Sequence, residues 1–157
     1  MTKHQQMQAY IRRYKEETGK KEIEMANVAD FAAKQGWILP QPITPLDLLA
    51  REFAQAAREE TRNDGKTGKV YRVNHAVTEP GKQGSFWVDI DEAPRKHIHK
   101  SLVQRREQMV GDGMQLTLDQ DHWNSVNPNE EPINLPMDLQ PDIDWRKNAS
   151  DEDEQTG

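Results

Sequence analysis

Basic side chains gather in one segment of this 157-residue chain, residues 95–106. The segment holds five lysines and arginines and no carboxylate, so it is suited to displacing counterions from a phosphate backbone. Pro94 is typical of a helix start, and Ile98, Leu102 and Met109 follow one apolar stripe of a helix that begins there. With this stripe facing inward, the helix would expose its basic residues. The candidates for phosphate binding are Arg95, Lys96, His99, Lys100, Arg105 and Arg106.

An internal partner is the alternative for this basic helix. The chain carries a net charge of −6, unevenly distributed: residues 107–157 hold 13 acidic against two basic residues, which leaves 14 acidic against 19 basic in residues 1–106. The front is therefore basic and the back acidic. Asp138, Asp142 and Asp144 could fold back onto the basic helix and occupy it. Both alternatives stay open at this point.

A second group of candidates lies on a helix expected from Thr44 to about Glu60. A threonine cap followed by Pro45 is a strong helix start, and the apolar residues from Leu46 to Ala57 keep a helical stripe. Arginine can make bidentate contacts to guanine and glutamine to adenine. The candidates on or just after this helix are Arg51, Gln55, Arg58 and Arg62. Neighbouring glutamates could instead pair with these arginines on a solvated face.

Two strands are expected further along the chain. Residues 70–77 and 85–90 are rich in β-branched and aromatic side chains. The loop between them, residues 78–84, is too long for a two-residue turn and would project from a hairpin. Lys82 and Gln83 would stand at its tip, where they could reach phosphates.

The N-terminal part is expected to be mainly helical. Apolar residues every three to four positions predict a helix over about residues 4–18, which Gly19 would end. Alternation over residues 21–25 is typical of a short strand. A second helix is expected over residues 26–35, with Asn27 as its cap.

The remaining segments are expected to be less regular. Two prolines make residues 37–42 an extended connector whose apolar side chains pack back on the core. The glycines of residues 111–113 would end the basic helix, and residues 114–118 alternate like a short strand. Residues 124–157, with four prolines and many carboxylates, indicate an extended arm followed by a disordered acidic end.

The order helix, strand, helix, helix, strand, loop, strand resembles the winged helix-turn-helix architecture over about residues 4–92. In that family the third helix enters the major groove and the loop between the strands, the wing, contacts the backbone or minor groove. The resemblance implies an α+β fold: a winged-helix-like three-helix core with a two- to three-stranded β-wing, an added fourth helix and an extended acidic C-terminal arm. The expected domains are residues 1–92, 93–123 and 124–157.

The residue types and their spacing do not indicate a catalytic site or a metal site. The chain has no cysteine, which excludes thiol catalysis and thiolate metal sites. His97 and His99 would point to different sides of a helix, and residues 119–123 lack the glycine and glutamate of a calcium loop. Asp89 and Asp91 resemble a nuclease pair without the lysine pattern that would support it. We therefore expect no enzyme, no metal and no cofactor.

Two function classes remain. The first is a nucleic-acid-binding protein, with duplex DNA favoured, that acts as a regulator or accessory component of a larger DNA-handling system. The second is an adaptor whose arm, residues 124–148, engages a protein partner. Trp87 could stack on bases, although isolated tryptophans are more often packing anchors. No secretory signal or membrane-spanning stretch is apparent, so we expect a cytoplasmic protein without a membrane partner.

Overall fold

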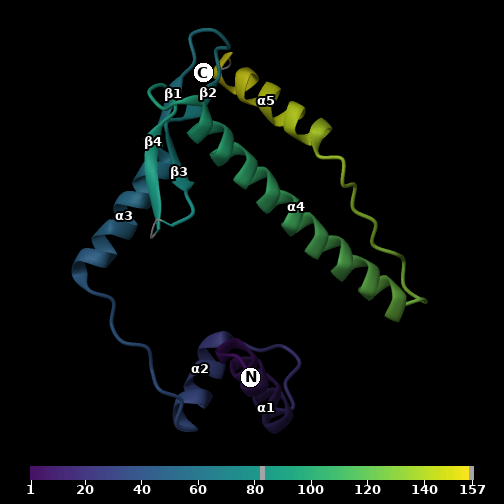
Figure 1. Ribbon diagram of the computed structural model, residues 1–157. Coiled ribbons are helices and arrows are strands. Elements are labelled where there is room, and N and C mark those ends of the chain that lie inside the picture. The colour runs from purple at the N-terminus through teal and green to yellow at the C-terminus, as the bar shows by residue number, and fades with distance from the viewer. Residues whose placement is uncertain (82–83, 156–157) are drawn as a thin grey trace. The chain divides into compact units, whose positions relative to one another are not determined.

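The computed structural model describes residues 1–81 and 84–155, with side chains up to residue 149. It is an α+β protein whose described part contains five helices and two small antiparallel sheets (Figure 1). The elements are α1 (Lys3–Thr18), α2 (Met25–Lys34), α3 (Pro45–Glu59), β1 (Thr61–Asn63), β2 (Val70–Arg72), β3 (Asn74–Thr78), β4 (Ser85–Asp89), α4 (Arg95–Val126) and α5 (Gln140–Gln155).

The chain divides into two compact units, Met1–Glu52 and Phe53–Gly157. The boundary falls within α3, and the expected domains over residues 1–92, 93–123 and 124–157 stay a prediction. The general α+β class agrees with the sequence analysis. The winged-helix arrangement of three helices and a wing stays a prediction.

Helix α1 is fixed by local signals at both ends, of which the sequence predicts the C-terminal one, Gly19. The Thr2 side chain accepts a hydrogen bond from the Gln5 backbone, and the Gln5 side chain accepts one from the Thr2 backbone. This reciprocal pair satisfies two N–H groups that a helix start leaves free. Gly19, at φ 69°, takes the left-handed conformation that ends the helix.

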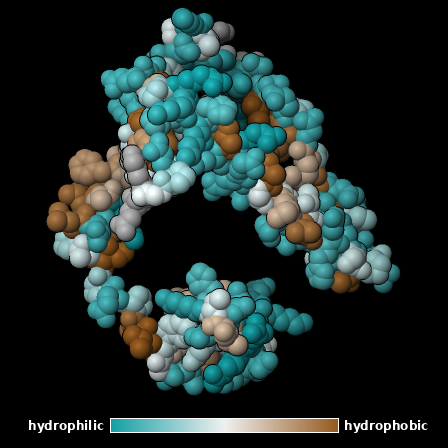
Figure 2. All heavy atoms as spheres, in the orientation of Figure 1, coloured by the Kyte–Doolittle hydropathy of each residue, from teal (hydrophilic) through white to brown (hydrophobic). Residues whose placement is uncertain are grey.

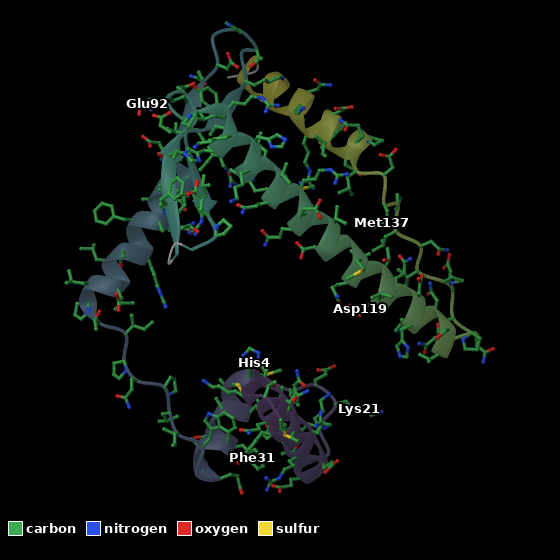
Figure 3. The ribbon with its side chains drawn as sticks, viewed as in Figure 1. His4, Lys21, Phe31, Glu92, Asp119 and Met137 are labelled. Atoms are coloured by element: carbon green, nitrogen blue, oxygen red, sulfur yellow. The ribbon has the colours of Figure 1, made fainter. Side chains whose placement is uncertain are left out.

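Aromatic side chains hold the first unit together. Tyr14, from α1, and Val28, from α2, are buried, each 7% exposed. The Tyr14 and Phe31 rings meet edge to face with their centroids 5.6 Å apart, and Tyr10 meets Trp37 in the same way at 5.3 Å. Figure 3 labels Phe31 where α2 faces α1. Edge-to-face pairs of this kind add to the stability that comes from apolar burial.

Three expectations for the first unit are wrong in detail. Residues 21–25 form no strand; instead α2 begins at Met25, after Glu24. Asn27 is not the cap, because its backbone N–H already donates to the Glu24 carbonyl inside the first turn. In the connector, Trp37 packs on Tyr10 as expected, but Ile38 and Leu39 do not pack back, since they are 86% and 64% exposed.

Helix α3 begins where the sequence predicts but buries nothing along its length. The Asp47 backbone N–H donates to Thr44 Oγ1 at 3.2 Å, which is the predicted cap. No residue of α3, all of which is described, is buried. Leu46 is 78% exposed and Phe53 67% exposed, and Figure 2 shows hydrophobic side chains gathered on the surface of α3. The predicted stripe is therefore present but lies open.

The strands form two hairpins, where the sequence indicated one. β1 pairs with β2, and β3 pairs with β4, both antiparallel. The expected single strand over residues 70–77 breaks at Val73, whose N–H donates to the Glu60 carbonyl and whose carbonyl accepts from Ile90. Val73 and Val77 are 1% and 0% exposed, so they form the core of the second unit.

Helix α4 continues through its glycines, which corrects the predicted helix end at residues 111–113 and the predicted strand at residues 114–118. A glycine inside a helix costs only about 1 kcal/mol relative to alanine, and the long helix α4 extends on both sides of the two glycines. Gly113 also gives room to Met137, whose Cε would lie 3.2 Å from a Cβ at this position. The glycine thus serves close packing rather than helix termination.

The segment after α4 folds back along that helix. Asn124 and Gln120, one helical turn apart, hydrogen-bond to the backbone of Ile133 and Leu135. Helix α5 follows where the sequence indicated a disordered acidic end. No helix in the described part of the chain is long and apolar enough to cross a membrane.

Candidate nucleic-acid interface

A cavity of about 370 Å³ lies in the second unit, where the end of α3, the end of β2, the second hairpin and α4 meet. We call it the arginine cavity. Its cationic lining consists of Arg58, Arg72 and Arg105. Its other lining residues are Asn74, His75, Ala76, Thr78, Trp87, Ser101, Gln104 and Gln108.

The packing of α4 on β3 positions one wall of the arginine cavity. Ser101 is only 3% exposed, and its small side chain allows the helix to approach the strand closely. Arg105 follows Ser101 by four residues, so both lie on neighbouring turns of the same helix face. Gln104 and Gln108 are spaced in the same way and complete this wall.

His75, on β3, is buried, and both nitrogens of its ring contact polar groups of the protein. Its Nε2 lies 3.1 Å from the Arg72 carbonyl oxygen and its Nδ1 lies 3.4 Å from Ser101 Oγ. A carbonyl only accepts, so Nε2 carries the proton and donates in this contact. The pair joins strand to helix and fixes the backbone of Arg72.

The three arginines of the cavity keep their charge available. Arg58 Cζ lies 5.3 Å from the ring centroid of Trp87, a cation–π contact that orients the guanidinium without neutralising it. Among the described residues, no carboxylate forms an ion pair with Arg58, Arg72 or Arg105. One carboxylate lies nearby, since Glu60 Oε1 accepts from Asn74 Nδ2 at 2.8 Å.

Arg62, by contrast, is engaged within the protein. Its guanidinium donates to Asp89 at 2.7 and 3.0 Å and to Asp91 at 2.7 Å, while the Tyr71 hydroxyl also donates to Asp91 at 2.7 Å. The hydrogen bond from Arg62 lowers the pKa of Asp89, and the hydrogen bond to Asp91 raises the pKa of Tyr71. Asp89 and Asp91 therefore tie Arg62, in β1 of the first hairpin, to the end of β4 in the second hairpin.

Arg51 and Gln55, the other candidates on α3, do not line the arginine cavity. Gln55 Nε2 donates to Glu59 Oε1 at 2.9 Å, so its amide is engaged within the helix. Arg51 belongs to the first compact unit. Lys82 and Gln83 lie outside the described residues.

The basic segment of α4 is divided between several surfaces. Arg95, Lys96 and His99 are exposed and Lys100 is half-buried, so this part of the predicted stripe faces solvent. Arg105 lines the arginine cavity.

Arg106, one residue further on, lines a second cavity of about 650 Å³ together with Asp138 and Met137. The structure thus places Asp138, one of the carboxylates considered as an internal partner, on the same cavity as Arg106. Figure 3 labels Met137 on the segment that returns along α4.

Several residues of the arginine cavity were not predicted from the sequence. Arg72 lies in a segment that reads only as a strand, and Asn74, Gln104 and Gln108 carry no motif. Their common location depends on how α4 packs on the second hairpin. Within the described residues, no group of three or more His, Cys, Asp or Glu side chains is placed to hold a metal ion.

Comparisons with protein-family models, with curated proteins and with solved structures found no match to this chain. The functional argument therefore depends on the geometry and charge of the site itself.

Proposed function

We propose that this protein is non-catalytic and binds nucleic acid through the arginine cavity, as an accessory component or regulator of a DNA-handling system. The observation that carries the proposal is the presence of Arg58, Arg72 and Arg105 on one cavity, with no carboxylate of the described residues bound to any of them. Such guanidiniums present planar forks that match phosphate oxygens bidentately. The exposed basic residues at the start of α4 provide further charge on the same helix.

The negative net charge does not oppose this proposal, because it resides elsewhere in the sequence. Thirteen of the 27 acidic residues follow position 106, whereas all three cavity arginines precede it. Local charge rather than net charge determines the potential that a phosphate meets within a Debye length of about 8–10 Å. The carboxylate of Glu60 weakens that local potential without pairing with a cavity arginine.

The test is fluorescence anisotropy of the purified full chain with labelled duplex DNA, single-stranded DNA and RNA at low and near-physiological salt. Each phosphate contact that is lost should reduce the slope of log affinity against log salt by about 0.7–0.9. Arg105→Gln should weaken binding and reduce this slope. Lys66→Gln, which removes one positive charge from the turn of the first hairpin, is the matched control and should change neither.

Two results would contradict the proposal. One is the absence of saturable binding to every nucleic acid at low salt. The other is an equal loss of affinity in Arg105→Gln and Lys66→Gln, which would show that binding responds to total charge and not to the cavity.

A protein-interaction adaptor is the second candidate, and the exposed apolar residues of α3 favour it. Leu46 and Phe53 leave more apolar surface in water than a solvated helix requires. In this role, a bound partner protein should be lost in Phe53→Ser and retained in Arg105→Gln. The opposite pattern would favour nucleic acid.

A further inference from the structure

We infer that the arginine cavity recognises a phosphomonoester, the dianionic phosphate that ends a nucleic-acid strand or belongs to a free nucleotide. This inference rests on the proposed function and names the chemical group that the cavity selects. It distinguishes a strand end from the continuous diester backbone.

The first argument is charge. A phosphomonoester carries a charge of about −1.5 to −2 at pH 7 and offers three free oxygens, whereas a backbone diester carries one negative charge. Three guanidiniums, from Arg58, Arg72 and Arg105, line the cavity. A phosphomonoester can therefore neutralise more of the positive charge of these guanidiniums than a single internal phosphate of a strand can.

The second argument is shape. The cavity volume of about 370 Å³ lies within the range of small-molecule sites, about 300–1,000 Å³. An internal phosphate is joined to sugars on both sides and follows the outer surface of a strand. A terminal phosphate is joined on one side only, so it can enter a concave site while the strand remains outside.

The third argument is that rigid elements hold the cationic groups. Arg58 is oriented by the face of Trp87. The backbone of Arg72 is fixed by the His75 ring and precedes the buried Val73. Arg105 lies one turn beyond the packed part of α4. Groups that are already placed lose less conformational entropy when the ligand arrives.

The neutral lining supplies a place for the rest of the nucleotide. Gln104 and Gln108 lie one turn apart on α4, and their amides can donate to and accept from a sugar or base. Thr78 and Asn74 line the cavity from β3. These groups would contact the sugar or base of the terminal nucleotide.

The experiment uses the full chain and oligonucleotides of one sequence that differ only at their ends. The ends are 5′-hydroxyl, 5′-phosphate, 3′-phosphate and a 5′-phosphate esterified with methyl, each tested single-stranded and as a duplex. We expect a phosphorylated end to bind at least about tenfold more tightly than the hydroxyl end, the size of one charge-assisted hydrogen bond. The methyl ester should lose most of this gain because it removes one charge from the phosphate.

A competition experiment distinguishes the two possible sources of the phosphomonoester, which are a strand end and a free nucleotide. Adenosine monophosphate and inorganic phosphate are added to the preformed complex. Displacement only at millimolar concentration would support a strand end as the ligand, and displacement at micromolar concentration would support a free nucleotide. Both outcomes agree with a monoester site.

Variants connect the preference to the cavity. Arg72→Gln and Arg105→Gln, which change exposed side chains, should each reduce the ratio of affinities for phosphate and hydroxyl ends. Lys66→Gln should leave this ratio unchanged. Arg72 lies on β2 and Arg105 on α4. The same loss in both variants would therefore not arise from a local folding defect of one element.

The outcomes distinguish this inference from the proposed function. Equal affinity for phosphorylated and hydroxyl ends, with binding still dependent on Arg105, would overturn the monoester inference and leave nucleic-acid binding intact. Binding of adenosine monophosphate without binding of any oligonucleotide would support the monoester site and overturn the proposed function. Absence of both kinds of binding would overturn both.

Discussion

The contact between Asn124 and the returning segment allows a quantitative test of how that segment is held. Asn124 Oδ1 accepts from the Ile133 N–H at 2.9 Å, and Asn124 Nδ2 donates to the Ile133 carbonyl at 2.8 Å. One side chain therefore binds both backbone groups of one residue. Asn124→Ala removes both bonds while leaving α4 with a residue of high helix propensity.

The expected loss follows from the two bonds. Each contributes about 0.5–1.5 kcal/mol net, and the lower end applies here because both are exposed to water. A total loss of about 1–1.5 kcal/mol raises the population in which the segment around Ile133 is detached from α4 roughly five- to tenfold. The segment should not detach fully, because Gln120 still binds Leu135 and Met137 still packs over Gly113.

Amide hydrogen exchange measures this opening at single residues. In Asn124→Ala, the Ile133 amide should exchange about five- to tenfold faster, and the Leu135 amide should change less. Ser125→Ala is the matched control, since its hydroxyl donates to the His122 carbonyl within α4 and does not reach the segment. An unchanged exchange rate at Ile133 would refute the reasoning that Asn124 secures the segment.

Three further predictions concern charge and backbone. The hydrogen bond from Arg62 lowers the pKa of Asp89, so the stability that this ion pair contributes is present above the ordinary carboxyl pKa and is lost as the pH falls through the lowered value. The melting temperature of Asp89→Asn, measured between pH 5 and 2, should therefore depend less on pH than that of the unchanged protein. Glu60→Gln keeps an acceptor for Asn74 and should increase nucleic-acid affinity at low salt in anisotropy. Gly19→Ala should destabilise the first unit by about 1 kcal/mol in denaturant unfolding, because φ there is 69°.

Elements with local signals could be predicted from the sequence. Helix α1 is determined by an apolar period and a glycine stop, and α3 by a threonine cap and Pro45, all within a few residues of where they act. The end of α2 is equally local: Gly36 has φ 96°, and the Trp37 N–H returns to the Ala32 carbonyl. Such features do not depend on the rest of the fold.

Features that depend on distant residues could not be predicted in this way. The glycines of residues 111–113 indicate a helix end until Met137, more than twenty positions later, is placed over Gly113. Likewise, Arg62 reads as a free cation until Asp89 and Asp91 are brought beside it. In each case a tertiary contact decides between two local alternatives that the sequence leaves open.

Two adjacent arginines show how one basic segment can serve both alternatives considered for it. Successive residues of a helix point about 100° apart, so Arg105 and Arg106 cannot face the same surface. Arg106 lines the cavity that holds Asp138 from the acidic back of the chain, whereas Arg105 lines the arginine cavity with Arg58. The acidic segment can therefore lie along α4 without neutralising the cavity, and nucleic-acid binding does not require that segment to leave.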